Sequence, residues 1–255
     1  MPLHRPETLT GAVARHISDA IVRGDYSPGS NLPEVALARE LDTSRGTVRE
    51  ALRMLAAGGL VEIIPHRGVF VSQLSVRATW EITSLRAILE PYGARLALDA
   101  AGSDPAMHEE VDRALESLAT AVRTGDPLAV ADADIGFHRA VFARCDHQML
   151  LNRLDALQIL SRRLILMGEL YASDGPAVLR QHAPIAAAVR ARRPEVLEAE
   201  VRSHVIDAGE QLIAQMTARQ PARPRRAKGD AFQPGSWPSA LTPEATPPTL
   251  AVGDG

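Results

Sequence analysis

The most informative stretch of this sequence, residues 37–71, reads LARELDTSRGTVREALRMLAAGGLVEIIPHRGVFV. It starts with a short apolar helical face, which a polar turn at residues 42–44 separates from the next segment. Ser and Thr in that turn can cap a following helix. Apolar side chains then recur three and four residues apart, which predicts a helix with one buried face over residues 45–57. Gly58 and Gly59 end this helix.

The rest of the N-terminal region completes a compact unit over residues 1–72. Residues 7–23 carry an apolar stripe that predicts another helix. Two short runs of β-type residues, at 60–64 and 69–72, flank Pro65-His66-Arg67-Gly68, which predicts a hairpin. Two short helices joined by a tight turn and followed by a two-stranded wing are the pattern of a winged helix-turn-helix module.

Such a module places its second helix in the major groove of duplex DNA, where arginine side chains can pair with guanine. Arg45 stands at the start of the expected reading helix, and a hairpin tip with glycine can approach the minor groove closely. Residues 1–72 hold eight Arg and eight Asp or Glu, so DNA affinity must come from local placement, and a solvated arginine face is the alternative. The candidate contacts are Arg39, Ser44, Arg45, Thr47, Arg49, His66 and Gly68.

The rest of the chain divides into three parts. Residues 73–79 form a short polar linker, and residues 80–217 carry helical periodicity without a strand signal. We expect six helices there, at about 80–101, 104–124, 127–144, 148–170, 176–191 and 194–217. Residues 218–255 hold seven of the 18 prolines and few apolar residues, so we expect a disordered tail. The predicted fold class is mainly α, with a winged helix-turn-helix followed by an all-α bundle.

Composition limits the classes of protein that remain. A length of 255 residues suits one or two domains, and 45% hydrophobic residues suffice for a packed core. No run approaches the ~20 apolar residues that cross a bilayer, so we expect no membrane partner. The N-terminus lacks the apolar core of a signal peptide, and the single Cys145 excludes an intramolecular disulfide framework. We therefore expect a cytoplasmic protein.

Four residues in the helical part have metal-ligand chemistry. Asp134 and His138 are four apart, which places them on one helix face. His182 and His204 lie on two later expected helices and could meet them inside the bundle. Three imidazoles and one carboxylate suit a divalent ion such as Zn²⁺ or Ni²⁺, with Mn²⁺ as a further candidate. The alternative is that these are ordinary core or surface histidines.

The N-terminal motifs resemble the GntR family of bacterial transcription regulators. The matching pieces occur in the family's order and are GDYSPG (24–29), LAREL (37–41), SRGTVREAL (44–52), GLV (59–61) and RGVFV (67–71). The resemblance implies that the DNA contacts named above carry over residue by residue. Gly46 is a departure, because the family varies there among small residues, Thr and Pro.

The helical half resembles the FCD ligand-binding domain over roughly residues 79–215. The matching pieces are LRAILE (85–90), DIGFH (134–138), His182 followed by Ile185, and RSH (202–204). The resemblance implies that Asp134, His138, His182 and His204 bind the metal and that Arg86 pairs with a small carboxylic acid effector. In place of the Asn common after the third helix of this domain, the chain has Asp146-His147-Gln148, which puts the polar contacts of the effector in doubt.

We therefore expect a homodimeric, ligand-responsive DNA-binding regulator, more often a repressor in this class, and not an enzyme. A homodimer would bind a pseudo-palindromic operator in double-stranded DNA. One alternative within the class is a metal-free pocket for a larger effector such as an acyl thioester. A metal-dependent hydrolase is the alternative from another class, although the sequence has no HExxH, GxSxG or phosphate-binding glycine loop.

Overall fold

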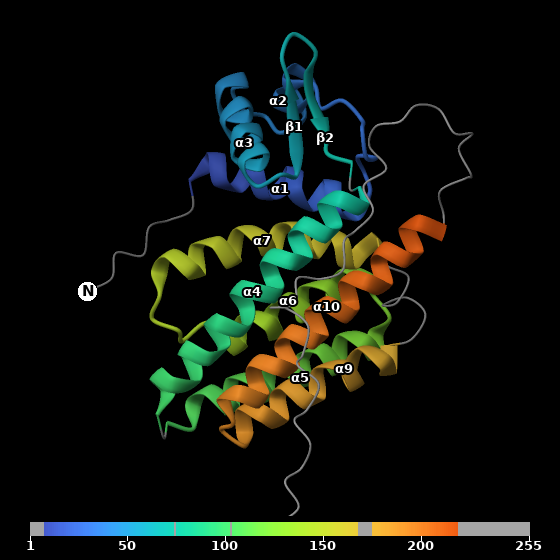
Figure 1. Cartoon of the computed structure of the whole chain (residues 1–255). Helices are drawn as coiled ribbons and strands as arrows, with labels where there is room; N and C mark the ends of the chain where they lie inside the picture. Colours follow the sequence, from blue (N-terminus) through green and yellow to red (C-terminus); the bar gives the residue numbers. More distant parts are fainter. Residues whose placement is uncertain (1–7, 74, 103, 168–174, 219–255) are drawn as a thin grey trace, which may run out of the picture.

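The computed structural model describes residues 8–73, 75–102, 104–167 and 175–218. Within these ranges the chain forms a small winged helix-turn-helix domain above a helical bundle (Figure 1). The mainly helical fold class is confirmed. Residues 219–255 of the expected tail lie outside the described residues. No helix among the described residues is long and apolar enough to cross a membrane.

The N-terminal domain contains α1 (Leu9–Arg23), α2 (Glu34–Glu40), α3 (Arg45–Ala57), β1 (Val61–Ile64) and β2 (Gly68–Val71). The side chain of Ser44 caps α3 by accepting a hydrogen bond from the backbone N–H of Thr47. The strands pair antiparallel, with Val61 opposite Val71, and His66 and Gly68 take positive φ at the hairpin tip. Ile17, Val48, Leu52 and Leu60 are buried together, so the apolar faces expected from the sequence form one core.

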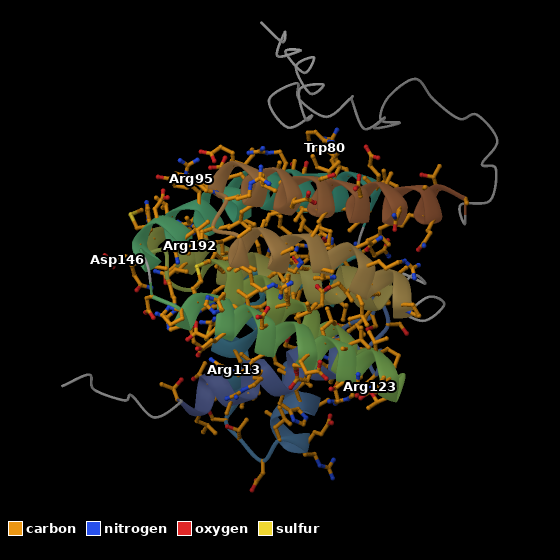
Figure 2. The ribbon with its side chains drawn as sticks, turned by 90° about the horizontal axis from the view of Figure 1, so that it is seen from below. Trp80, Arg95, Arg113, Arg123, Asp146 and Arg192 are labelled. Carbon is orange, nitrogen blue, oxygen red and sulfur yellow. The ribbon has the colours of Figure 1, made fainter. Side chains whose placement is uncertain are left out.

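The bundle contains α4 (Val76–Ala101), α5 (Ala106–Thr124), α6 (Pro127–Phe142), α7 (Gln148–Met167), α9 (Gly175–Arg190) and α10 (Pro194–Ala218). Helix α4 begins at Val76, inside the expected linker, because Ser75 accepts a hydrogen bond from the backbone N–H of Ala78 and caps it. Helix α10 packs along α4, and the two form one outer layer of the bundle (Figure 2).

Helix α7 joins the two domains. It lies beneath α1 and contacts it (Figure 1). Arg162 on α7 pairs with Asp19 of α1 at 2.7 Å and with Asp132 of α6 at 2.5 Å. The next residue, Arg163, is buried and donates a hydrogen bond to the carbonyl of Ser72, just after the wing. Two adjacent arginines on one helix of the bundle therefore contact the N-terminal domain.

The close approach of α4 and α10 yields a test of the packing. A Cβ on Gly209 would collide with the side chain of Thr83, so we expect Gly209→Ala to lower the free energy of unfolding by about 1–3 kcal/mol. Gly136 on α6 is exposed, with open space around its Cα, so Gly136→Ala should raise stability by up to about 1 kcal/mol through helix propensity. Urea unfolding followed by circular dichroism measures both, and equal effects would contradict the described helix contact.

Candidate functional site: a buried histidine cluster and a DNA-reading face

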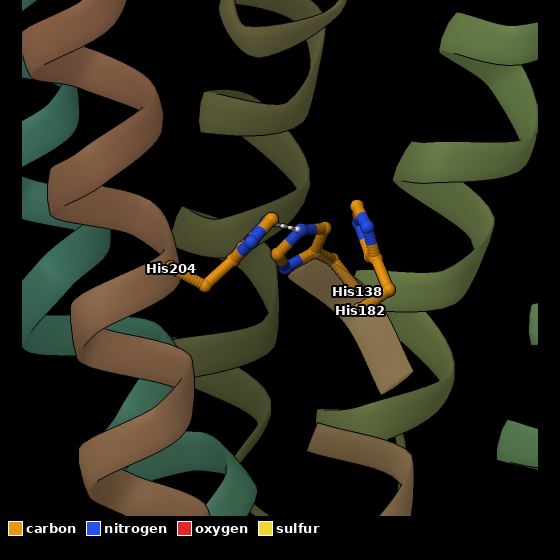
Figure 3. A group of neighbouring side chains, drawn as sticks. All are labelled: His138, His182 and His204. Atoms are coloured by element: carbon orange, nitrogen blue, oxygen red, sulfur yellow. Dashed lines mark hydrogen bonds between the residues drawn. The ribbon is translucent and has the colours of Figure 1, made fainter. Parts of the chain in front are cut away.

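Three histidines from three helices meet inside the bundle. His138 on α6, His182 on α9 and His204 on α10 are all buried, and their ligand nitrogens lie within 4.8 Å of one another (Figure 3). The His138 and His204 Nε2 atoms are 3.1 Å apart. Asp134, one turn before His138, is also buried, and its Oδ1 lies 3.0 Å from His182 Nε2. The structure thus brings the three nominated histidines together and places Asp134 in contact with one of them, His182.

Hydrogen bonds on the far side of two rings define which nitrogen points inward. His138 Nδ1 lies 2.8 Å from Glu90 Oε2, and His182 Nδ1 lies 2.7 Å from the Val178 carbonyl oxygen. In the tautomer that a metal ligand requires, each Nδ1–H donates to these acceptors and each Nε2 presents a lone pair to the centre. A metal-binding histidine has this arrangement, in which a carboxylate or carbonyl orients the ring.

The donor set fits a cation. In that tautomer, lone pairs on Nε2 atoms and a carboxylate oxygen would face one another in a buried space, and a positive charge among them would offset their repulsion. Nitrogens bound to one ion at about 2.1 Å in adjacent positions would be about 3 Å apart, near the His138–His204 separation. The cluster could therefore hold a divalent metal ion.

Charges in the cluster are strongly perturbed by burial. Burial raises the pKa of Glu90, but the Arg86 guanidinium and His138 outweigh it and lower the pKa to about 2. Burial also raises the pKa of Asp134, but the hydrogen bond from His182 and the nearby imidazoles lower it overall. Burial, aided by His182 and His138, moves the pKa of His204 well below its usual value. His204 is therefore neutral near pH 7, which is the ligand form.

Arg86 on α4 lies next to this cluster and is buried. Its Nε donates to Glu90 Oε1 at 2.5 Å, four residues along the same helix. A small cavity of about 50 Å³ opens beside it, with polar walls from Arg86, Asp134, His138 and His204 and apolar walls that include Leu164 and Ile165 of α7. The expected effector residue and three of the expected metal ligands thus face one space.

Glu90 is a residue of this cluster that the sequence analysis missed. It lies in the matched LRAILE segment, but a pair spaced four apart on a helix usually marks an exposed ion pair. Only the fold shows that Glu90 is buried and joins Arg86 to His138. No spacing rule in the sequence could have distinguished these two situations.

The expected DNA contacts gather on α2, α3 and the wing, at the end of the molecule away from the bundle (Figure 1). Arg45 is exposed at the first turn of α3, and Arg39, His66 and Gly68 are exposed as well. Ser44 and Thr47 form the helix cap, with their hydroxyl oxygens 2.8 Å apart.

Arg49, another candidate contact, forms an ion pair within the domain. Its guanidinium forms a bidentate ion pair with Glu34 of α2, at 2.7 Å for the shortest contact. The hydrogen bond from Arg49 lowers the pKa of Glu34. The sequence analysis did not identify Glu34, which fixes the direction of an arginine on the exposed face of α3.

A winged helix-turn-helix joined to a helical domain is the architecture of a class of protein, the DNA-binding transcriptional regulators. Residues 9–71 match the family described as bacterial regulatory proteins, gntR family, and residues 81–207 match the FCD domain. This chain belongs to the GntR family of transcriptional regulators with an FCD domain. It is a regulator and not an enzyme, which sets aside the hydrolase alternative.

Individual relatives are also described as transcriptional regulators. The chain is 33% identical over 200 residues to a probable D-xylose utilization operon transcriptional repressor of Paenarthrobacter nicotinovorans, covering 78% of this chain and 86% of the relative. It is 28% identical over 204 residues to the galactonate operon transcriptional repressor of Escherichia coli, covering 71% and 86%. A GntR regulator structure from Rhodococcus sp. RHA1 superposes with a TM-score of 0.69 at 27% identity, covering 80% and 97% of the two chains.

The pKa of Glu90 predicts a pH-dependent effect on stability. Because folding lowers this pKa from 4.5 to about 2, the charged carboxylate stabilises the fold fully above about pH 4.5, and this contribution is lost as the pH falls towards 2. Glu90→Gln leaves Arg86 without its carboxylate, so we expect it to cost about 3 kcal/mol near neutral pH.

Urea unfolding measures the free energy of unfolding of the unmodified protein and of Glu90→Gln from about pH 7 to about pH 3.5. The difference between the two free energies should narrow as the pH falls. Glu109→Gln on α5, an exposed glutamate, is the matched control and should change stability little. A gap that stays constant down to the lowest pH would contradict a low pKa for Glu90.

Proposed function

We propose that this chain is a ligand-responsive repressor that binds a divalent metal ion and a small carboxylic acid in its helical domain. The supporting observation is the shared cavity, because Arg86, Asp134, His138 and His204 all line it. Asp134, His138, His182 and His204 would hold the ion, with Zn²⁺ or Ni²⁺ favoured by three imidazoles and Mn²⁺ as a further candidate. The ion would supply a positive charge and open positions for a carboxylate oxygen.

Arg86 is the residue that would bind the acid. A guanidinium can pair with a carboxylate through two parallel hydrogen bonds. Glu90 accepts from its Nε and so fixes the direction of the side chain that lines the cavity. Arg86 would share its guanidinium between Glu90 and the effector.

The size of the cavity favours a small effector over the alternative of an acyl thioester in a metal-free pocket. A drug-sized ligand needs a pocket of about 300–1,000 Å³. The cavity here measures about 50 Å³, and its polar wall carries the ligand-type residues. One relative controls a galactonate operon, and galactonate is a sugar acid. A cavity of this size has room for only a few heavy atoms, so a small carboxylic acid is the effector class that we propose.

Helix α7 provides the physical link between effector and DNA. Leu164 and Ile165 line the cavity, while Arg162 and Arg163 contact the DNA-reading domain. An effector that binds more tightly to one position of α7 would shift the reading domain towards the matching position. Coupling requires that the effector's affinity differs between the two positions. Relief of repression on binding is the expected outcome. Because it acts on chromosomal DNA, the regulator would work in the cytoplasm. It would bind a pseudo-palindromic operator as a homodimer.

Metal binding can be tested on protein purified without a histidine tag. After chelation, Zn²⁺ at about 100 times its dissociation constant should raise the melting temperature by roughly 5–10 °C. His138→Gln and His204→Gln should abolish this rise and reduce the bound metal measured by mass spectrometry.

The control for the metal test is His16→Gln, which changes an exposed histidine on α1. It should behave like the unmodified chain. Protein that binds no metal before or after loading would support the metal-free alternative and overturn this part of the proposal.

DNA recognition is tested at Arg45. With a labelled duplex from the region upstream of the protein's own gene, Arg45→Ala should lose about 1–3 kcal/mol of binding free energy, which is roughly 5- to 150-fold in affinity. Fluorescence anisotropy at constant salt measures this change. Arg123→Ala removes an exposed arginine on α5 in the bundle and should leave affinity unchanged. Full affinity of the Arg45 variant would contradict the assignment of α3 as the reading helix.

A further inference from the structure

The exposed face of α4 carries an unusual arrangement of side chains. We call it the α4 stripe, and its seven members are Arg77, Glu81, Leu85, Ile88, Tyr92, Arg95 and Asp99. At 100° per residue these seven fall within about 80° of one another around the helix. The opposite face of α4 packs against α6, α7 and α10. The stripe is therefore a single line of side chains on the outer side of the helix, bordered at its far end by α10, where Arg95 also pairs with Glu195 and Glu198.

The centre of the stripe is apolar and its two ends are charged. Leu85, Ile88 and Tyr92 are large hydrophobic residues, each about half exposed at 49%, 51% and 51%. Clustered exposed apolar residues mark interaction sites, whereas isolated ones need no explanation. Arg77 and Glu81 lie at one end, 3.6 Å apart, and Arg95 and Asp99 at the other, 3.2 Å apart. Figure 2 places Arg95 on the outer side of the α4–α10 layer.

The order of the charges makes the stripe complementary to itself when reversed. Arg77 lies 11 residues before Ile88 and Asp99 lies 11 residues after it. Glu81 and Arg95 are likewise seven residues on either side. In an antiparallel pair of α4 helices centred on Ile88, each arginine would therefore face an acidic residue of the other copy. A parallel pair would instead put like charges together, which is unfavourable.

We propose that the occupant of the α4 stripe is a second copy of this chain, bound antiparallel about a two-fold axis at Ile88. This inference rests on the proposed homodimer and names its surface. Ile88 would meet Ile88 of the other copy, and Leu85 would meet Tyr92. The contact is isologous, as a two-fold interface requires.

The geometry restricts how the two helices cross. The charged pairs at 11 residues lie about 16 Å from the centre along the axis. A shallow crossing of about 20° keeps the long side chains within reach of each other at that distance, whereas a crossing near 50° separates them. The charged ends would thus define register and crossing angle, and the apolar centre would provide most of the buried area.

A second surface continues the stripe towards the DNA-reading domain. A groove between the wing and the bundle is lined by Leu85 and Glu81 of the stripe, and by Ile63, an exposed apolar residue of β1. The apolar surface thus extends from α4 onto the wing strand.

The test begins with cross-linking, which does not depend on weakening the fold. Ile88→Cys places a thiol on the proposed axis, so mild oxidation should yield a covalent dimer that reductant reverses. Arg123→Cys, at an exposed residue of α5 on the opposite side of the bundle from the α4–α10 layer (Figure 2), is the matched control and should remain monomeric on a denaturing gel. The native Cys145 is buried and gives the background in unmodified protein.

Charge exchange then tests the register by sedimentation. Ile88→Glu should raise the dimer dissociation constant at least about 100-fold, because two like charges would meet. Arg77→Asp and Asp99→Arg should each weaken the dimer, and the double variant should restore it. A dimer that survives Ile88→Glu, or a double variant weaker than both singles, would overturn the assignment.

The outcomes also separate this inference from the proposed function. Unmodified protein that is monomeric would overturn both the α4 stripe and the homodimer, and something else would then cover the stripe. A stable dimer that is insensitive to the stripe variants and still binds upstream DNA through Arg45 would overturn the stripe alone.

Discussion

The helical domain depends on the requirement that buried charges have partners. Glu90 cannot be buried without Arg86 and His138, and Asp134 cannot be buried without His182. These contacts tie α4 to α6 and α6 to α9, while His204 brings α10 into the same centre. The relative rotation of four helices is thus fixed by a few polar atoms, since turning one helix would leave a charge unpaired. The groups that could bind a ligand are also those that fix the packing.

Much of this could be predicted from the sequence, for identifiable reasons. The reading helix and its wing follow from apolar spacing and from a glycine pair, which are local signals. The helix expected at 80–101 began earlier, at Val76, because the capping side chain of Ser75 lies within a segment whose polarity resembles a linker. The four metal-type residues were found from residue chemistry and a family resemblance, and the structure brings them together.

Long-range pairings were beyond the sequence. Glu34 and Arg49 are 15 residues apart, and nothing in their spacing shows that two short helices bring them into a bidentate pair. Arg162 and Asp19 are separated by 143 residues, so their contact depends on how the two domains meet. Glu90 was overlooked because a glutamate four residues after an arginine is common on solvent-exposed helices. In each case the missing information was burial or three-dimensional proximity, which periodicity does not contain.

The close contact between Gly209 and Thr83 constrains how this binding pocket can diverge. Both residues also line the cavity, so in this wall the backbone of Gly209 packs against the side chain of Thr83 with no room for a Cβ. A larger side chain there would push the helices apart before it reshaped the pocket. Leu164 and Ile165 on α7 form a wall without that restriction. Related regulators can therefore change effector preference on the side that also touches the DNA-reading domain, so altered specificity and altered signal transmission would tend to evolve together.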